Sequence, residues 1–379
     1  MKFIHLSDLH IGKRVNEYSM LEDQQYILKE ILGIIDDEKP DCVIIAGDIY
    51  DKSIPPAESV SVFDDFLVRL AERKIKVFVI SGNHDSPERI AFGGRLMNAS
   101  GIYMSPVYDG RSAAIKLSDE YGSLNVYMLP FIKPSHVRRY YEGAEIESYT
   151  DALRVAIDGM NIDESERNII ITHQFVTGSD RTDSEEISVG GTDNVDVAVF
   201  EKFDYTALGH IHRAQNCSSE KVRYSGTPLK YSFSEVNDKK SVTVVELFEK
   251  GNMTVRTVPL IPLRDMHEIS GKYEELMSRS FYENTPYCDD YMHITLTDED
   301  EVYDAIGRLR TIYKNIMKLD YDNMRTRSRF EGSGAERVEQ KSPFVHFEEF
   351  YEKQNERPMN DLQSDFVKRV IEEIWEGAK

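Results

Sequence analysis

The first 85 residues alternate between short apolar runs and longer stretches in which apolar residues recur every three or four positions. The runs at 2–6, 41–47 and 76–81 are short and nearly continuous, which is typical of strands that are buried on both faces. The stretches at 18–37 and 59–74 place apolar side chains on one helical face. These faces are formed by Ile27, Ile31, Ile34 and Ile35, and by Val60, Phe63, Leu67 and Leu70. The order strand, helix, strand, helix, strand predicts a layered α/β domain.

Beyond residue 204 the pattern changes to short strands separated by turns. A helix near 150–160 and the strand "NIIITH" continue the first pattern up to that point. The later strands are "DYTALGH", "KVRYSG", "SVTVVELF" and "MTVRTVPL", and the last two flank "EKGN" as in a hairpin. We expect these strands to complete the same unit, so that residues 1–262 form one domain.

Three further segments follow this domain. Residues 264–323 predict a small α+β cap, with the strand "DYMHITLT", the helix "EDEVYDAIGRLRTIYKN" and the strand "IMKLDYD". Residues 324–343 have no periodicity and are rich in Arg, Gly and Ser, which indicates a flexible linker. Residues 344–379 predict a helix-loop-helix, in which Asn360 and Gln363 cap the second helix. Because a hairpin of this size buries little apolar surface by itself, it either docks on the rest of the chain or binds a partner, and we favour the partner.

Composition limits the class of protein. The chain has 379 residues, 40% of them hydrophobic, and no run approaches the roughly 20 apolar residues of a membrane-spanning helix. A strand-like segment begins directly after Met1, so we expect a cytoplasmic protein without a membrane association. The three cysteines form no Cys-x-x-Cys pair, which argues against a thiolate zinc site. The net charge of −21 argues against nucleic-acid binding by a basic surface, unless metal ions or a partner supply positive charge.

Side chains that can bind metal ions follow five of the expected strands. They are Asp8 and His10 in "FIHLSDLHIG", Asp48 in "CVIIAGDIYD", Asn83 in "ISGNHDSPER", His173 in "NIIITHQF", and His210 and His212 in "DYTALGHIHRA". In open α/β sheets, ligands collect outside the carboxyl ends of the strands. A lone histidine or aspartate at such an end is usually structural, but five such ends in one chain indicate a site. Nitrogen and oxygen donors without a thiolate favour Mn, Fe or Zn.

Seven donors are too many for one ion that keeps room for water, and they suit two ions that share a carboxylate. Asp48 lies in the middle of the set and is the expected bridge. Two ions about 3.5–4 Å apart can activate a water molecule and polarise a phosphoryl oxygen. The sequence therefore predicts a two-metal phosphoesterase.

The segment "GNHD" supplies two further candidates, which we expect to be catalytic. Since Asn83 binds metal through its amide oxygen, the adjacent His84 points towards the substrate. Histidine exchanges a proton near neutral pH, so His84 is the expected general acid for the leaving oxygen. Asp85 is expected to orient the other ring nitrogen of His84.

Taken in order, the motifs Asp-x-His, Gly-Asp, Gly-Asn-His-Asp, His and Gly-His-x-His resemble those of the calcineurin-like metallophosphoesterases. The segments "AGDIYDKSIPP", "GNHDSPER", "LGHIHRAQ", "YSGTPLKYSFSE" and "FEEFYEKQNERPM" are similar to a group of DNA nuclease subunits within that family. The resemblance spans nearly the whole chain and is weakest in 264–340. It implies a layered α/β/β/α sandwich with a small α+β cap domain and a C-terminal helical hairpin.

The resemblance also implies an activity and partners. It implies one ion held by Asp8, His10, Asp48 and His212, and another held by Asp48, Asn83, His173 and His210. Both ions would be Mn²⁺, and His84 would be the catalytic histidine. The implied activity is 3′–5′ exonuclease on double-stranded DNA and endonuclease on single strands and hairpins, in DNA repair, recombination and replication. The implied partners are DNA, an SbcC-type coiled-coil ATPase at the C-terminal helices, and a second copy at residues 55–100, giving a homodimer within a heterotetramer.

Two other interpretations remain open from the residues. A phosphatase for small or protein substrates is one, although such enzymes resemble GDxVDRG and GNHE, whereas this chain has "GDIYDKS" and "GNHD". A scaffold that has lost catalysis is the other, although all seven donors and His84 are present. Asp51 stands where some relatives have a histidine, so details of proton transfer at that position are not carried over.

Overall fold

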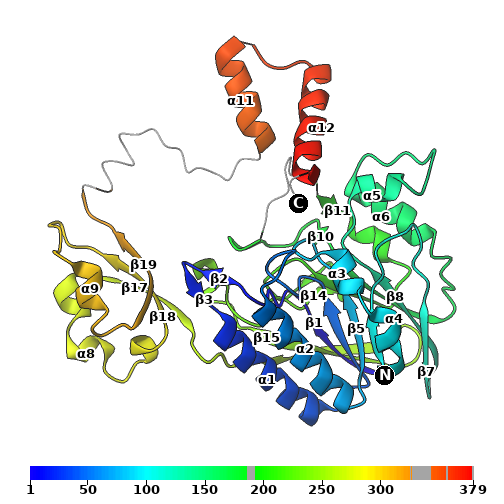
Figure 1. Cartoon of the computed structure of the whole chain (residues 1–379), viewed down its shortest axis with the longest axis horizontal. Coiled ribbons are helices and arrows are strands. Elements are labelled where there is room, and N and C mark those ends of the chain that lie inside the picture. Colours follow the sequence, from blue (N-terminus) through cyan, green and yellow to red (C-terminus); the bar gives the residue numbers. More distant parts are fainter. Residues whose placement is uncertain (186–192, 325, 327–342, 356, 378–379) are drawn as a thin grey trace.

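The computed structural model describes residues 1–185, 193–324, 326, 343–355 and 357–377 (Figure 1). The predicted linker at 324–343 lies almost wholly outside these residues. Among the described residues, no helix has both the length and the apolar character needed to cross a membrane.

The first sheet of the described chain has six strands in the order β16-β15-β1-β4-β5-β6. Strands β1, β4, β5 and β6 are parallel, whereas β15 runs antiparallel to β1 and pairs with β16 as a hairpin. The bounds are β1 (Lys2–Leu6), β4 (Cys42–Ala46), β5 (Lys76–Ile80), β6 (Ile102–Met104), β15 (Ser241–Leu247) and β16 (Met253–Pro259). The expected hairpin around "EKGN" is therefore present.

The second sheet also has six strands within the described chain, in the order β13-β14-β12-β9-β8-β7. Its central strands β14, β12, β9 and β8 are parallel, and its two edge strands are antiparallel to their neighbours. The bounds are β7 (Ile115–Asp119), β8 (Gly122–Leu129), β9 (Arg167–His173), β12 (Tyr205–Gly209), β13 (Gln215–Cys217) and β14 (Ser219–Tyr224).

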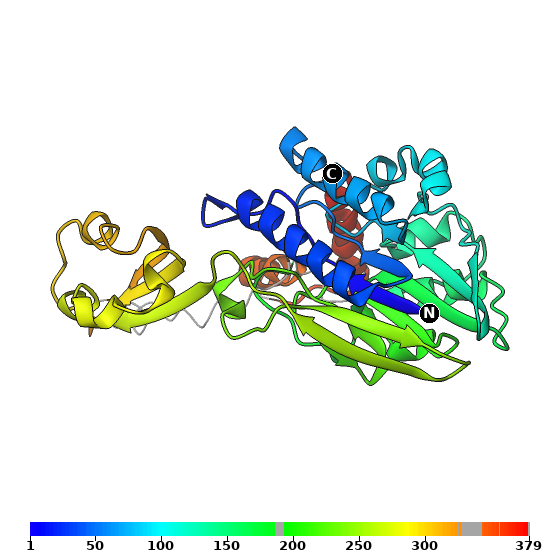
Figure 2. The ribbon, with the colours of Figure 1, turned by 90° about the horizontal axis from the view of Figure 1, so that it is seen from below.

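The two sheets pack face to face, and helices cover both outer faces (Figures 1 and 2). Strand β4 shows why its sequence is apolar throughout. Ile44 and Ala46 face the second sheet, whereas Val43 and Ile45 face the helices. The covering helices are α1 (Leu21–Glu38) and α2 (Ala57–Glu72) on the first sheet, and α5 (Pro134–Arg138) and α6 (Tyr149–Asp158) on the second. The expected α/β/β/α sandwich is confirmed.

The prediction that Val60 belongs to the buried face of α2 is wrong. Val60 is 43% exposed, and Phe66 is buried together with Phe63, Leu67 and Leu70. The spacing i, i+3, i+4 and i+7 defines the inner face of a helix, and Val60 lies beside that face.

Several shorter elements connect the main ones. They are β2 (Arg14–Val15), β3 (Tyr18–Ser19), α3 (Pro87–Ala91), α4 (Gly94–Met97), β10 (Phe175–Val176), β11 (Asn194–Val195), and the 3₁₀ turns η1 (Asn98–Ser100), η2 (Val197–Phe200), η3 (Phe233–Glu235) and η4 (Pro286–Cys288). Of these, η3 matters most below, because it is a part of the first domain that contacts the small unit.

The small unit after residue 262 lies at one end of the molecule (Figure 2). Its parallel strands are β17 (Met266–Gly271), β18 (Tyr291–Leu296) and β19 (Asn315–Tyr321), and its helices are α7 (Tyr273–Leu276), α8 (Arg279–Tyr282) and α9 (Ala305–Leu309). The sequence predicted only two strands and one long helix here. The helix starts later than predicted because Asp304 has a left-handed φ of 47°, so α9 begins only after it.

Two helices lie at the C-terminal end, α11 (Pro343–Asn355) and α12 (Asp361–Gly377). Asn360 N donates to Gln363 Oε1 at 3.0 Å, and Gln363 N donates to Asn360 Oδ1 at 2.9 Å. This reciprocal pair is the cap that the sequence predicted. Gln363 Nε2 also donates to Tyr351 Oη of α11 at 3.1 Å, which joins the two helices.

Candidate metal centre

The structure brings together all seven predicted metal ligands at one edge of the two sheets. Each lies at or just after the carboxyl end of β1, β4, β5, β9 or β12. The side chains of Asp8, His10, His173 and His212 are almost completely buried. Because the two sheets present their carboxyl ends side by side, residues up to 202 positions apart meet here.

One set of ligands, which we call the His212 group, consists of Asp8, His10 and His212. One ligand atom of each lies within 4.8 Å of the others. Nε2 of His10 and Nε2 of His212 are 3.1 Å apart. Both rings therefore direct a donor nitrogen into the same small volume.

The second set, which we call the His173 group, consists of Asp48, Asn83, His173 and His210. Asn83 Oδ1 lies 2.9 Å from His173 Nε2 and 3.0 Å from His210 Nδ1. Asp48 Oδ2 lies 3.3 Å from His173 Nε2 and 3.6 Å from His10 Nε2. The Asp48 carboxylate thus lies between the two groups, as a bridging ligand would.

The chemistry of this donor set fits divalent metal ions. The atoms that face one another are carboxylate, amide and imidazole donors, without sulfur, which suits ions such as Mn, Fe or Zn. Among the described residues, buried His10 Nδ1 has no hydrogen-bond partner. Two carboxylates buried beside four imidazoles require either protons or cations for compensation.

Burial and neighbouring charges set the protonation of these groups. Burial lowers the pKa of His10 and of His210 well below the usual histidine value, which leaves both rings neutral, as ligands must be. Burial would raise the pKa of Asp48, but His173 and His84 hold it well below its usual value. Burial likewise opposes the charged form of His173, yet Asp48 raises the pKa of His173 to about 9. The centre therefore holds an ionised carboxylate at its middle.

The backbone is strained at four of the ligand positions. Asp8, His10, Asp48 and His210 have φ values of 53°, 44°, 49° and 105°. Left-handed conformations are unfavourable for residues other than glycine, and they concentrate at functional sites. All four lie in the loops that follow β1, β4 and β12, where they turn the chain so that the side chains point towards one another.

Two glycines permit close approaches of the chain at the centre: Gly209 lets the two sheets approach each other, and Gly82 lets the loops after β4 and β5 approach each other. A Cβ on Gly209 would lie 1.9 Å from Ala46 O and 2.6 Å from His173 Nδ1. A Cβ on Gly82 would lie 2.1 Å from Asp48 Oδ1. Both positions therefore require glycine, because the space that a side chain needs is occupied by the centre itself.

The expectation that Asp85 orients His84 is wrong. Both carboxylate oxygens of Asp85 accept backbone N–H groups, from Ile49 at 3.1 Å, Tyr50 at 3.0 Å and Gly82 at 2.9 Å. These three amide donors engage both oxygens, so the Asp85 carboxylate fixes the loops after β4 and β5.

His84 is oriented instead by the main chain of Asp51. Nδ1 of His84 lies 3.0 Å from Asp51 O, and the backbone N of His84 donates to Asp48 Oδ1 at 2.9 Å. Nε2 of His84 lies 4.0 Å from Asp48 Oδ2. Since a backbone carbonyl holds the ring, the side chain at position 51 does not determine its orientation.

Sequence reasoning missed the residues that support the ligands from behind. Gln24 Nε2 donates to His10 O at 2.7 Å, and Tyr231 Oη donates to Leu9 O at 2.5 Å. Ser184 Oγ lies 2.6 Å from His212 Nδ1. Tyr231 belongs to "YSGTPLKYSFSE", which carried the family resemblance, but nothing in the spacing indicated what these residues contact.

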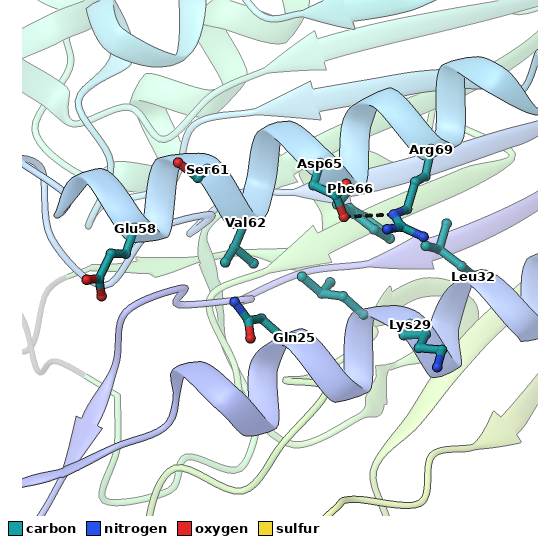
Figure 3. Close-up of a pocket in the computed structure, with 10 residues that line it drawn as sticks. Gln25, Lys29, Leu32, Glu58, Ser61, Val62, Asp65, Phe66 and Arg69 are labelled. Atoms are coloured by element: carbon teal, nitrogen blue, oxygen red, sulfur yellow. Dashed lines mark hydrogen bonds and ion pairs between the residues drawn. The ribbon is translucent and has the colours of Figure 1, made fainter.

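A separate groove of about 670 Å³ lies between α1 and α2 (Figure 3). Leu28, Leu32, Val62 and Phe66 contribute its apolar lining, and Arg69 forms an ion pair across one turn of α2. None of the seven predicted ligands lines this groove. We therefore do not assign the metal centre to it, although it is large.

Comparison with known proteins agrees with the geometry. Residues 1–214 match the family model of the calcineurin-like phosphoesterases, and residues 262–355 match a model described as the type 5 capsule protein repressor C-terminal domain. The chain is 32% identical over 378 residues, 98% of each chain, to the SbcD subunit of the nuclease SbcCD from Staphylococcus epidermidis.

Two solved structures are more distant. A dimetal phosphatase from Danio rerio is 13% identical, with a TM-score of 0.38 over 69% of this chain and 98% of its own. The phosphoesterase Yfce from E. coli is 11% identical, with a TM-score of 0.28 over 69% of this chain and 100% of its own. At these values neither likeness bears on the site. The family model and the relative that spans the whole chain show that this protein belongs to the calcineurin-like phosphoesterases, in the family of the SbcD subunit of the nuclease SbcCD.

Proposed function

We propose that this chain is the nuclease subunit of an SbcCD-type complex and hydrolyses phosphodiester bonds of DNA. One observation carries the proposal. The seven donors meet at the joined ends of two sheets, in a chain that is 32% identical over its length to the SbcD subunit of a nuclease SbcCD. The reaction class follows from the donors and from a relative named as a nuclease, and the choice of DNA follows from the family resemblance of the sequence segments.

The residues would hold two divalent ions, most favourably Mn²⁺. Asp8, His10 and His212 would hold one ion, Asn83, His173 and His210 would hold the other, and Asp48 would serve both. Bound divalent ions supply positive charge for the phosphate oxygens and lower the pKa of water, which makes a nucleophile available near neutral pH.

His84 is the proposed proton donor for the leaving oxygen. Its Nδ1 donates to Asp51 O, so Nε2 is the atom that remains free to hand over a proton. The side chain is 13% exposed, which lets a substrate reach it. Asp85 serves this role only indirectly, because it fixes the loops that carry Asp48 and His84.

We propose the finer activities that the family resemblance implied: 3′–5′ exonuclease on double strands and endonuclease on single strands and hairpins, serving repair, recombination and replication in the cytoplasm. The net charge of −21 supports a partner that supplies much of the DNA-binding surface. The C-terminal helices expose Phe350, Leu362 and Phe366. These apolar side chains support docking of an SbcC-type coiled-coil ATPase there.

A second copy of the chain is the other proposed partner, within a heterotetramer. The region 55–100 exposes large apolar side chains, with Phe92 and Leu96 each 83% exposed and Val68 47% exposed. The groove of Figure 3 adjoins the same region through α2. Apolar surface of this kind supports pairing of two copies.

The test is Mn²⁺-dependent cleavage of an end-labelled DNA duplex, with and without the ATPase partner and ATP. His84→Asn should reduce cleavage by about 10²–10⁴-fold while both ions still bind. His267→Asn is the matched control, because the ring of His267 is also held by a hydrogen bond, to Asp290 Oδ2 at 2.8 Å, but lies in β17 of the small unit. It should cleave like the unchanged protein.

Two outcomes would contradict the proposal in different ways. Loss of both ions in His84→Asn would mean that His84 is a ligand rather than a proton donor. Absence of DNA cleavage, alongside rapid hydrolysis of bis-p-nitrophenyl phosphate, would keep the phosphodiesterase chemistry and discard the DNA substrate.

A further inference from the structure

His212 is the ligand that the surrounding side chains hold most extensively. Its backbone N donates to Glu185 Oε1 at 2.6 Å, and its backbone O accepts Lys240 Nζ at 3.0 Å. Its ring Nδ1 lies 2.6 Å from Ser184 Oγ. The main chain and the ring are therefore fixed independently.

Behind the ring, Ser184, Glu235 and Lys240 form a chain of buried hydrogen bonds, which we call the relay. Ser184 Oγ donates to Glu235 Oε1 at 2.5 Å, and Lys240 Nζ donates to Glu235 Oε2 at 2.5 Å. The side chain of Glu235 has no exposed surface, and that of Lys240 is 7% exposed. Because Lys240 also reaches His212 O, the relay closes on the residue from which it starts.

The relay determines which nitrogen of His212 carries the proton. Glu235 is paired with Lys240, so its carboxylate is ionised and can only accept. Ser184 therefore gives its one proton to Glu235, and its oxygen accepts from Nδ1–H of His212. Nε2 is left with its lone pair, and Nε2 is the atom 3.1 Å from His10 Nε2 inside the His212 group.

None of these three residues is itself in the metal centre. Ser184 follows β10, Glu235 ends η3 and Lys240 precedes β15. Partners that orient a metal-binding histidine through its second nitrogen typically change metal affinity by about 10–100-fold when they are replaced.

We propose that Ser184, Glu235 and Lys240 are positioning residues that fix the tautomer of His212 and thereby set the affinity for the ion held by the His212 group. The inference rests on the proposed metal centre. It predicts a selective effect, because the ligands of the His173 group do not contact the relay.

The experiment is a calorimetric titration of the metal-free protein with Mn²⁺, which gives the number of ions and the affinity for each. Ser184→Ala and Glu235→Gln should each weaken one ion by about 10–100-fold and leave the other unchanged. The variant that carries both substitutions should bind the affected ion as tightly as the more affected single variant does, because both changes break the same relay.

Asp204→Asn is the matched control. Asp204 is also a buried carboxylate, paired with Lys250 at 3.0 Å, but it precedes β12 at the end opposite His210. This variant should lower the melting temperature without changing either affinity. If Glu235→Gln does not fold, Ser184→Ala still interrupts the relay and leaves the Glu235–Lys240 pair in place.

Three results would overturn the inference. Unchanged affinity for both ions in Ser184→Ala would show that the relay does not position His212. Equal weakening of both ions would show a general structural role. Failure of the unchanged protein to bind any ion would remove the proposed centre together with the inference, whereas two bound ions and unaffected variants would remove the inference alone.

Discussion

His173 and His212 are both buried imidazoles in the centre, but they are held by different means. Nδ1 of His173 lies 2.8 Å from Ala46 O, a main-chain carbonyl at the end of β4 in the facing sheet. Nδ1 of His212 lies 2.6 Å from the hydroxyl of Ser184. Ser184 donates in turn to Glu235, which also accepts from Lys240. One ring is held by the packing of the sheets, and the other by replaceable side chains.

This difference separates what the fold determines from what single residues can adjust. A backbone carbonyl persists under every substitution, so the His173 group depends on how closely the two sheets approach. The relay of the His212 group can be interrupted at one residue without disturbing the sheets. It also includes η3, whose Phe233 lies against the small unit.

The largest expected effect is on the His173 group, through Gly209→Ala. The new Cβ would lie 1.9 Å from Ala46 O and 2.6 Å from His173 Nδ1, so the sheets must move apart where the ring is held. We expect a loss of roughly 3 kcal/mol in the free energy of unfolding, and loss of the ion of the His173 group. Urea unfolding and metal titration measure the two effects.

Gly33→Ala is the control for that substitution. A Cβ on Gly33 would have no atom within 4 Å, and the residue lies inside α1. Alanine there should stabilise the protein by about 0.5–1 kcal/mol, because glycine loses more backbone freedom in a helix. Unchanged stability and metal binding in Gly209→Ala would contradict the claim that sheet approach holds His173.

The second-largest expected effect is a loss of stability at acid pH, which also arises between the two sheets. His5 lies between the sheets, with Nδ1 2.9 Å from Tyr205 Oη, and burial followed by the charge of Arg223 lowers its pKa from 6.5 to about 3. Above about pH 6.5, His5 is neutral in both the folded and the unfolded chain, so its ionisation does not change the free energy of unfolding. As the pH falls from there towards 3, His5 binds a proton in the unfolded chain but stays neutral in the folded chain. The free energy of unfolding therefore declines.

The size of this decline follows from the pKa difference. Each pH unit in that window removes about 1.4 kcal/mol, so His5 should cost roughly 2 kcal/mol at about pH 5. His5→Gln keeps a hydrogen-bonding partner for Tyr205 but does not titrate. The difference in free energy of unfolding between the two proteins should therefore change with pH, and a constant difference from about pH 7 to about pH 5 would refute the assignment to His5.

The meeting of the seven donor side chains at one edge of the sheets could be predicted from the sequence, and the contacts that support them could not. Asp48, Asn83 and His173 follow apolar runs, and parallel strands bring such ends to one edge of a sheet. The contacts of Asp85 were predicted wrongly, because its acceptors are filled by backbone amides 35 and 36 residues away. Unlike the local cap formed by Asn360 and Gln363, bonds to main-chain N–H groups this far away along the chain are marked by no sequence pattern.

The small unit shows the same limit for the fold. Periodicity indicated a helix across 299–315, but the left-handed Asp304 makes α9 begin only at Ala305, and the helix ends at Leu309. Strand β17 was missed, although its residues Met266 and Ile269 are buried. Short parallel strands of mixed polarity have no distinctive pattern, and only their pairing in space identifies them.

The smallest expected effect concerns the relay's support from outside the first domain. The ring of Phe233 in η3 lies 5.2 Å from the ring of His293 in β18, measured between centroids, and Glu235 follows two residues later. A ring contact of this kind contributes about 0.5–1.5 kcal/mol. Phe233→Ala should therefore let η3 shift and weaken binding of the ion of the His212 group by about two- to tenfold, since a tenfold change corresponds to about 1.4 kcal/mol.

Phe248→Ala is the matched control, because the ring of Phe248 packs edge-on against Tyr121 at 5.9 Å, away from the centre. Both variants should lose similar stability in urea, but only Phe233→Ala should lower a Mn²⁺ affinity in titration. If Phe233→Ala weakens both ions, the two halves of the centre are not supported separately, and the contrast between His173 and His212 fails. If it weakens neither, η3 is rigid without the small unit, and the relay is fixed within the first domain alone.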